Sequence, residues 1–173
     1  MDFLKQRKGK LGGIAISGGE PTIQKGLIDF IKKIKNIGYK VKLDTNGSNP
    51  KVLKELLDNN LVDYVAMDIK NDLDNYEEIT KCRVNIKSIK ESINILLKSN
   101  IDYEFRTTII KEYHTLKNIK NILKIIKNKK YYIQNFKLSA DVIDKNLTSF
   151  TEDELKLIKQ DLQDIPNVIL RDL

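Results

Sequence analysis

The fold is decided by Ile14-Ala15-Ile16-Ser17-Gly18-Gly19-Glu20-Pro21, a short apolar run that ends in two glycines. Residues 22–36 follow it with apolar side chains at helical spacing. A strand that ends in two glycines and then enters a helix brings bare backbone close to any bound molecule. Glu20 and the fixed turn at Pro21 lie beside that gap. The stretch predicts a strand–turn–helix unit whose backbone can hold a small polar ligand.

Strand-like and helix-like segments alternate along the rest of the chain. The expected strands are 13–17, 39–44, 62–69, 102–109, 131–138 and 167–171. The expected helices are 22–36, 50–59, 85–99, 115–128 and 151–163, with a weaker one at 73–80. Alternating strands and helices predict a parallel sheet, either open and doubly wound or closed towards a barrel.

The two faces of each strand decide between these architectures. In 39–44, Val41 and Leu43 alternate with the charged Lys42 and Asp44, and the strands at 62–69 and 102–109 alternate in the same way. A doubly wound sheet buries both faces, so its strands read as continuous apolar runs. We therefore expect the apolar faces to lie under the helices and the polar faces to line a ligand-filled interior. Because a full eight-unit barrel needs about 250 residues, the sequence predicts an α/β fold, a partial TIM-type barrel of parallel βα units.

Composition limits the class of protein. A chain of 173 residues is ordinarily one domain, here 1–173, and no apolar run approaches the roughly 20 residues of a membrane span. The single cysteine, Cys82, excludes an internal disulfide and fits a reducing cytoplasm. The net charge of +7 comes from lysines spread over almost every helical segment. We therefore expect a cytoplasmic protein with neither a nucleic-acid nor a membrane partner.

Polar residues gather where the predicted strands end, which is where parallel βα folds place their sites. Carboxylates of Asp44 and Asp68 about 5 Å apart would repel by roughly 3 kcal/mol at an effective dielectric constant of 20. A cation should offset this repulsion: Lys70, the ammonium group of a ligand, or a bound monovalent ion. Arg106 suits a carboxylate. The set therefore predicts a zwitterionic ligand, such as the amino-acid end of a larger molecule. The alternative is that Asp68–Lys70 and Glu104–Arg106 are ion pairs in a polar core.

Four stretches carry a resemblance to a known family: Gly18-Gly19-Glu20-Pro21-Thr22, Lys42-Leu43-Asp44-Thr45-Asn46-Gly47, Ala66-Met67-Asp68-Ile69-Lys70 and Glu104-Phe105-Arg106-Thr107-Thr108. They resemble the radical S-adenosylmethionine (SAM) enzymes. More narrowly, they resemble the activating proteins of glycyl-radical enzymes, and among these the group that activates anaerobic ribonucleoside-triphosphate reductase. The likeness runs in order from about Phe3 to Phe136.

The resemblance implies that eleven residues bind SAM: Ser17, Gly18, Gly19, Glu20, Asp44, Thr45, Asn46, Asp68, Lys70, Arg106 and Gln134. The first four would hold the methionine ammonium group. Asp44, Thr45 and Asp68 match positions that surround a monovalent cation near the methionine carboxylate. Lys70 and Arg106 would contact the polar end of the cofactor. The last of the eleven lies where the family often has a polar residue near the adenosyl part.

The chain departs from the family at the iron–sulfur cluster. In the family, a Cys-x3-Cys-x2-Cys loop upstream of the Gly-Gly-Glu-Pro motif holds a [4Fe-4S] cluster that donates one electron to SAM. The resulting 5′-deoxyadenosyl radical takes hydrogen from a glycine of the partner enzyme. Such a cluster needs three thiolates, and this sequence holds only Cys82. We therefore expect a chain truncated before its cluster loop, or a degenerate relative of the family, and no catalytic residue is assigned.

The resemblance also implies partners and leaves alternatives. The expected partners are a glycyl-radical enzyme, with anaerobic ribonucleoside-triphosphate reductase as the first choice, and an electron donor such as flavodoxin or ferredoxin. Within the enzyme class, an activator of pyruvate formate-lyase or a deazaguanine-forming radical enzyme stays open. From another class, a non-catalytic βα module that binds SAM or a nucleotide stays open too. His114, the only histidine, is expected at the surface.

Overall fold

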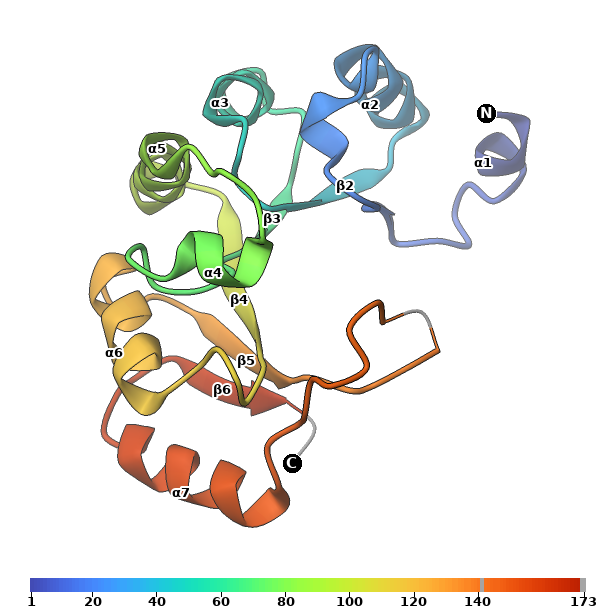
Figure 1. The fold of residues 1–173 in the computed structure, drawn as a ribbon. Helices are drawn as coiled ribbons and strands as arrows, with labels where there is room; N and C mark the ends of the chain where they lie inside the picture. The colour runs from blue at the N-terminus through green and yellow to red at the C-terminus, as the bar shows by residue number, and fades with distance from the viewer. Residues whose placement is uncertain (141, 172–173) are drawn as a thin grey trace. The chain divides into compact units, whose positions relative to one another are not determined.

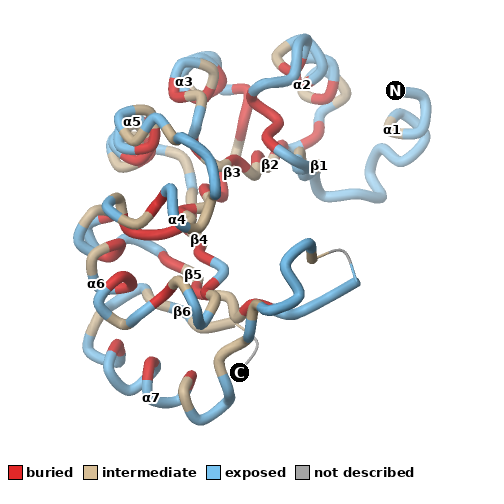
Figure 2. The backbone as a smooth tube through the Cα atoms, in the orientation of Figure 1, coloured by how far each residue is buried: buried red, intermediate tan, exposed pale blue. Residues whose placement is uncertain are grey.

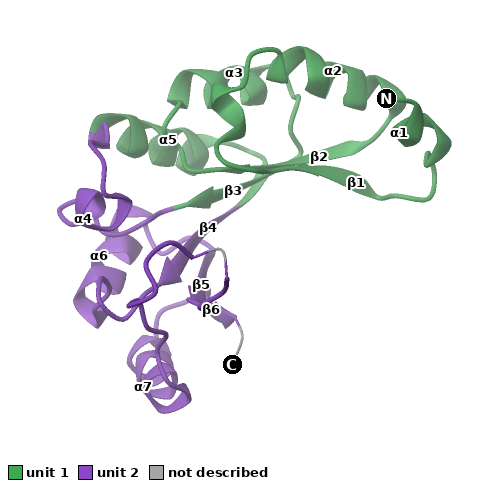
Figure 3. Cartoon of the chain, turned by 45° about the vertical axis from the view of Figure 1, so that its right-hand side comes forward, with its two compact units in different colours: residues 1–68, 87–103 green, residues 69–86, 104–173 purple. Residues whose placement is uncertain are grey.

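The computed structural model describes residues 1–140 and 142–171. They form two compact units, residues 1–68 with 87–103 and residues 69–86 with 104–173 (Figure 3). Each unit carries its own strands and covering helices. The two units are compact groups of residues, and they do not test the number of domains. That residues 1–173 form one domain stays a prediction.

Unit 1 contains three parallel strands and the helices that cover them. Its elements are α1 (Asp2–Gln6), β1 (Gly13–Ile16), the 3₁₀ helix η1 (Pro21–Ile23), α2 (Leu27–Ile37), β2 (Lys40–Thr45), α3 (Pro50–Asp58), β3 (Tyr64–Asp68) and most of α5 (Ile86–Lys98). In the sheet, β1 pairs with β2 from Gly13 opposite Lys40 onward, and β2 pairs with β3 from Lys42 opposite Tyr64 onward. In Figure 3, α2, α3 and α5 lie on one face of these strands.

The alternation predicted from the sequence separates the two faces of this sheet. Val41, Leu43, Val65 and Met67 are all buried on the helix-covered side. The helices bury side chains three or four positions apart against them: Ile31, Ile34, Leu53, Leu56, Ile89, Ile93 and Leu96. Burying each such side chain is worth about 1.5–3 kcal/mol relative to leaving it in water. The apolar stripes of the helices therefore hold the strands in place and leave the opposite, polar face for other contacts.

Unit 2 repeats the same construction. Its elements are α4 (Tyr76–Thr80), β4 (Asp102–Ile109, whose first two residues belong to unit 1), α6 (Leu116–Ile125), β5 (Tyr131–Asn135), α7 (Glu152–Leu162) and β6 (Val168–Arg171). Parallel pairing joins β4 to β5 and β5 to β6. Phe105, Ile109, Tyr131 and Ile133 are buried on one face. Figure 2 shows buried residues in each unit on the strands and on the helix sides that face them.

Capping residues set the helix ends much as the sequence suggests. Asn49 caps α3 through Val52 N–H, and Thr151 and Glu154 form a capping box at α7. The expected helix 22–36 is interrupted, however. Gly26 takes a left-handed conformation, with φ 82°, so that η1 ends first and α2 starts at Leu27.

These elements confirm the predicted α/β fold of parallel βα units (Figure 1). The described residues carry six strands, two fewer than a closed TIM barrel requires, in agreement with a partial TIM-like fold. Within this described range, no helix combines the length and apolar character needed to cross a membrane.

Candidate functional site

The loop after β1 leaves its backbone open. Ser17, Gly18 and Gly19 are exposed, and the two glycines have φ values of 106° and 50°. A Cβ atom built on either glycine would meet no atom of the chain within 4 Å. Since a positive φ disfavours any side chain, this stretch presents bare N–H and C=O groups to its surroundings. This is the open backbone that the sequence predicts.

Glu20 holds this loop to the end of β2. Its side chain is buried, and Oε1 accepts hydrogen bonds from Thr22 N (3.0 Å), Thr22 Oγ1 (2.5 Å) and Thr45 Oγ1 (2.8 Å). Oε2 accepts from Asn46 N at 2.6 Å. We name these four residues, Glu20, Thr22, Thr45 and Asn46, the Glu20 cluster. All four donors are neutral, so the carboxylate is solvated by the chain in place of water.

Asp44 and Asp68 lie on the same polar face of the unit 1 sheet. Asp44 is opposite Ala66 in the register, and Asp68 follows two positions later on the same side. Lys42, on that face too, pairs with Asp44, with Nζ 3.1 Å from Oδ1. Lys42 was predicted on the charged face of its strand, but not as the cation beside Asp44. Strand alternation was the signal that identifies it.

Thr45 faces the other side. It is buried on the helix-covered face, where its hydroxyl donates to Glu20 and accepts from Gly47 N. A monovalent cation near Asp44 and Asp68 would therefore have to use the main chain of Thr45. Among residues 1–140 and 142–171, no group of three or more His, Cys, Asp and Glu side chains is arranged to hold a metal ion. The monovalent cation stays a prediction.

The remaining predicted residues lie in unit 2. Arg106 and Gln134 share the polar face of its sheet, because Arg106 is opposite Tyr132 and Thr108 is opposite Gln134. The main chain of Arg106 accepts a hydrogen bond from Ile69 N at 2.8 Å. The expected site residues therefore fall into two groups, one in each unit. Their convergence on one ligand stays a prediction.

One cluster on this polar face was not predicted from the sequence. The buried carboxylate of Glu104 lies 3.5 Å from Arg171 Nη2, and the Arg171 guanidinium lies 3.8 Å from the centre of the Tyr132 ring. Stacking and ion pairing of this kind suit a guanidinium group. The polar positions of the last two strands carried the signal, but no motif marked them.

His114 corrects an expectation. It was predicted at the surface, and that prediction is wrong: only 2% of it is exposed. Nδ1 lies 3.0 Å from Ile110 N, and Nε2 lies 2.9 Å from the Lys70 carbonyl oxygen. Burial lowers the pKa of His114, against the backbone hydrogen bonds and the nearby Asp72. In the same connector Lys111 and Glu112 are exposed, whereas the imidazole of His114 turns to the main chain of Ile110 and Lys70.

Asp72 is a further buried carboxylate of unit 2. Oδ1 accepts from the main-chain and side-chain N–H groups of Asn75 (3.1 and 2.6 Å), and Oδ2 accepts from Asn118 (3.2 Å) and Asn121 (2.9 Å). We name these four residues, Asp72, Asn75, Asn118 and Asn121, the Asp72 cluster. Burial alone would raise the pKa of Asp72, but the hydrogen bonds from the asparagines outweigh it and the pKa is lowered.

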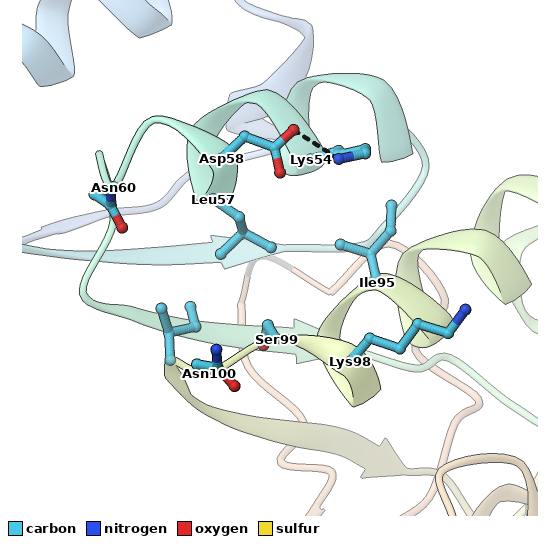
Figure 4. Close-up of a pocket in the computed structure, with 9 residues that line it drawn as sticks. Lys54, Leu57, Asp58, Asn60, Ile95, Lys98, Ser99 and Asn100 are labelled. Atoms are coloured by element: carbon cyan, nitrogen blue, oxygen red, sulfur yellow. Dashed lines mark hydrogen bonds and ion pairs between the residues drawn. The ribbon is translucent and has the colours of Figure 1, made fainter.

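Two hollows in unit 1 lie away from the predicted site. The groove in Figure 4, of about 350 Å³, lies between α3 and the end of α5 and is lined by Leu57, Ile95 and Lys98 among others. The second, of about 400 Å³, lies at the amino ends of the strands, beside Gly13, Lys40 and Tyr64. None of the eleven expected cofactor residues lines either hollow.

Comparison with known proteins identifies the family. The model of the "Radical SAM superfamily" matches residues 1–126 of this chain. The chain belongs to the radical SAM superfamily. This confirms the resemblance and the enzyme class read from the sequence.

Individual relatives agree with this assignment. Two proteins of Methanocaldococcus jannaschii, both named as glycyl-radical enzyme activating enzymes, are 40% identical over 167 residues and 30% identical over 156 residues. The matches cover 91% and 87% of this chain, but 70% and 58% of the relatives. A domain of the pyruvate-formate lyase-activating enzyme from Bacteroides vulgatus has the same fold, with a TM-score of 0.73 and 20% identity, covering 92% of this chain and 99% of that one.

The two cofactors of this family fit the chain differently. The open backbone at Gly18 and Gly19, with the acidic pair on the unit 1 sheet, suits the amino-acid end of SAM. The 173 residues do not suit a [4Fe-4S] cluster, because Cys82 is their only thiol and is exposed.

Proposed function

We propose that this chain is the SAM-binding part of an enzyme that activates a glycyl-radical enzyme, with anaerobic ribonucleoside-triphosphate reductase as its target. The observation that carries the proposal is 40% identity, over 91% of the chain, to a relative named as a glycyl-radical enzyme activating enzyme. The structure of the site supports the proposal as well, because the glycine backbone beside β2 is open to a ligand.

The roles of the chain's own residues follow from their contacts. Gly18 and Gly19 offer main-chain groups to the methionine end of SAM, and the Glu20 cluster keeps that backbone in place. Asp44 faces the ligand's ammonium group, with Lys42 beside it. Arg106 binds the carboxylate, and Gln134 the adenosyl part. When bound, SAM supplies the 5′-deoxyadenosyl group for the radical reaction of this superfamily.

Binding of SAM by the full chain tests this proposal. Isothermal calorimetry should detect heat with the native chain, and the Asp44→Ala and Arg106→Ala variants should each lose at least about thirtyfold in affinity, since each leaves a charged group without its partner. Asp58→Ala and Arg83→Ala, at exposed positions, are the matched controls and should bind as the native chain does. Native affinity in Asp44→Ala and Arg106→Ala would contradict the assignment of the site.

The choice of target needs its own experiment. Purified anaerobic ribonucleoside-triphosphate reductase and pyruvate formate-lyase are to be titrated separately onto the immobilised chain. We expect the reductase to bind more tightly. Tighter binding of pyruvate formate-lyase would replace the proposed target while leaving the class of activating enzymes intact.

A non-catalytic SAM-binding module is the second candidate, favoured by the single thiol of the chain. The two candidates differ in the second experiment and agree in the first. A module of this kind would bind SAM without binding either glycyl-radical enzyme.

A further inference from the structure

The buried imidazole of His114 lies between the main chain of Ile110 and the main chain of Lys70, both in unit 2. Ile110, which directly follows β4, has its N–H 3.0 Å from Nδ1. The main-chain N–H can only donate, so Nδ1 accepts and the ring proton is on Nε2. Nε2 then donates to the Lys70 carbonyl oxygen at 2.9 Å. Burial, which lowers the pKa of His114, favours this neutral form.

The segment that begins at Ile69 is held at several points of unit 2. Ile69 N donates to the Arg106 carbonyl at 2.8 Å, and Thr107 Oγ1 donates to the Ile69 carbonyl at 2.7 Å. Asn71 Nδ2 donates to the Tyr113 carbonyl at 3.0 Å. Among these contacts, the hydrogen bond from the imidazole is the one made to the carbonyl of Lys70 itself. The carbonyl of Lys70 fixes the peptide plane after this residue, and so the direction in which its side chain leaves the backbone.

We propose that His114 is a positioning residue for Lys70, and that its Nε2–H bond raises the affinity of the chain for the carboxylate end of SAM. This inference rests on the proposed function, in which Lys70 contacts the polar end of the cofactor. A side chain whose backbone is held before binding loses less conformational freedom when the ligand arrives. Loss of this one bond should therefore weaken SAM binding about tenfold without altering the contacts of Gly18 or Asp44.

Two substitutions separate the two hydrogen bonds of the ring. The amide nitrogen of His114→Gln reaches as far as Nε2 and can still donate to the Lys70 carbonyl, but nothing replaces Nδ1. The amide oxygen of His114→Asn takes the place of Nδ1 and can accept from Ile110 N, but the shorter side chain does not reach the Lys70 carbonyl. Each variant keeps one bond and loses one, so both should lower the urea midpoint by similar amounts.

SAM titration by calorimetry then decides. We expect His114→Gln to bind within about threefold of the native chain and His114→Asn about tenfold more weakly. Lys70→Ala, at a half-exposed position, should lose as much affinity as His114→Asn. Equal affinities of the Gln and Asn variants would overturn the proposal. If the Asn variant does not fold, native affinity in Lys70→Ala would overturn it instead.

A measurement without ligand separates this inference from the proposed function. Amide hydrogen exchange over residues 69–72 should be faster in His114→Asn and native-like in His114→Gln. If the native chain gives no heat with SAM, the proposed function fails together with the affinity claim, and exchange alone decides whether His114 positions Lys70. Equal exchange in both variants would refute that role as well.

Discussion

Unit 1 buries Glu20 in the loop after β1, unit 2 buries Asp72 in the segment before α4, and the two carboxylates serve different loops. Glu20 is 7% exposed and Asp72 is 3% exposed, and each accepts four hydrogen bonds from neutral donors. The donors to Glu20 include two main-chain N–H groups, and the glycines beside it border open space. The donors to Asp72 are mainly asparagine side chains, two of them on α6.

The difference shows that a buried acid in this chain need not be a ligand contact. In the Glu20 cluster the carboxylate fixes a loop whose backbone stays available for binding. In the Asp72 cluster the carboxylate ties a connector to a helix. We infer that Glu20 acts on SAM through the glycines that it holds in place, and that Asp72 acts on the stability of unit 2.

Removing the carboxylate of Glu20 should have the largest effect. Glu20→Ala leaves Asn46 N–H, Thr22 and Thr45 without their acceptor, and should cost roughly 4 kcal/mol of unfolding free energy. The variant should also lose its heat with SAM, because the Gly18–Gly19 backbone is no longer fixed. Urea denaturation and calorimetry measure the two effects.

Glu91→Ala, at an exposed position of α5, is the matched control and should change neither quantity. If Glu20→Ala folds as stably as the native chain, the cluster does not hold the loop, and the contrast with Asp72 fails.

Asp72→Asn should cost roughly 3 kcal/mol of stability, since an amide N–H then meets the N–H groups of the asparagines. Its pH dependence follows from the lowered pKa of Asp72. The stability is present above the unfolded pKa of about 3.9 and is lost as pH falls through the lower folded pKa. Urea midpoints at pH 7 and pH 3 should therefore differ less in Asp72→Asn than in the native chain.

Asp74→Asn, two residues away and exposed, should keep the native pH dependence. A loss of SAM affinity in Asp72→Asn with unchanged stability would reverse the roles given to the two carboxylates.

Strand alternation and the glycine motif allowed the sequence to predict most of the fold. The two-faced segments at 39–44 and 102–109 gave the parallel βα architecture, because burial on one side leaves a period of two in the sequence. The interruption of the helix at Gly26 was not predicted, since a glycine within a helical pattern does not by itself indicate a left-handed conformation.

The site was less predictable because the positions of its side chains depend on contacts between residues far apart in the sequence. Thr45, a hydrogen-bond partner of Glu20, lies 25 positions away in the sequence, and the contact of Glu20 with the ligand stays a prediction. His114 was expected at the surface because its neighbours in sequence are polar, while its partner Lys70 is 44 positions away. Local sequence carries no trace of such pairs. The register of neighbouring strands had to be known first.

Two glycines sharpen the comparison between a packed loop and an open one. Gly47 has φ 75°, and an added Cβ would lie 2.1 Å from Met67 Cε and 3.3 Å from Ser92 Cβ. Gly18 also has a positive φ, but a Cβ added there would meet no atom within 4 Å. Gly47→Ala should therefore cost roughly 2 kcal/mol, and Gly18→Ala roughly 1 kcal/mol from backbone strain alone. Urea denaturation of both variants measures the difference.

The order should be reversed for SAM affinity. Gly18→Ala should lose more affinity than Gly47→Ala, because Gly18, and not Gly47, borders the proposed ligand. A Met67→Ala background should reduce the cost of Gly47→Ala, since the clashing methyl group is then absent. Equal costs for the two glycines in the native background would show that packing around Gly47 yields without penalty.

The smallest expected effect is a dependence of the unfolding free energy on pH, caused by His114 in unit 2. Burial lowers the pKa of His114 below the unfolded value of about 6.5, so the unfolded chain binds more protons just below that pH. Stability should be complete above pH 6.5 and fall as pH drops towards the folded pKa, by less than about 1 kcal/mol between pH 7 and pH 5.5. His114→Gln should remove this slope in urea denaturation series. Because the sequence holds one histidine, no second imidazole titrates in this window. A slope that persists in His114→Gln would mean that another group links the folding of this chain to pH, and that the imidazole is not held neutral between Ile110 and Lys70.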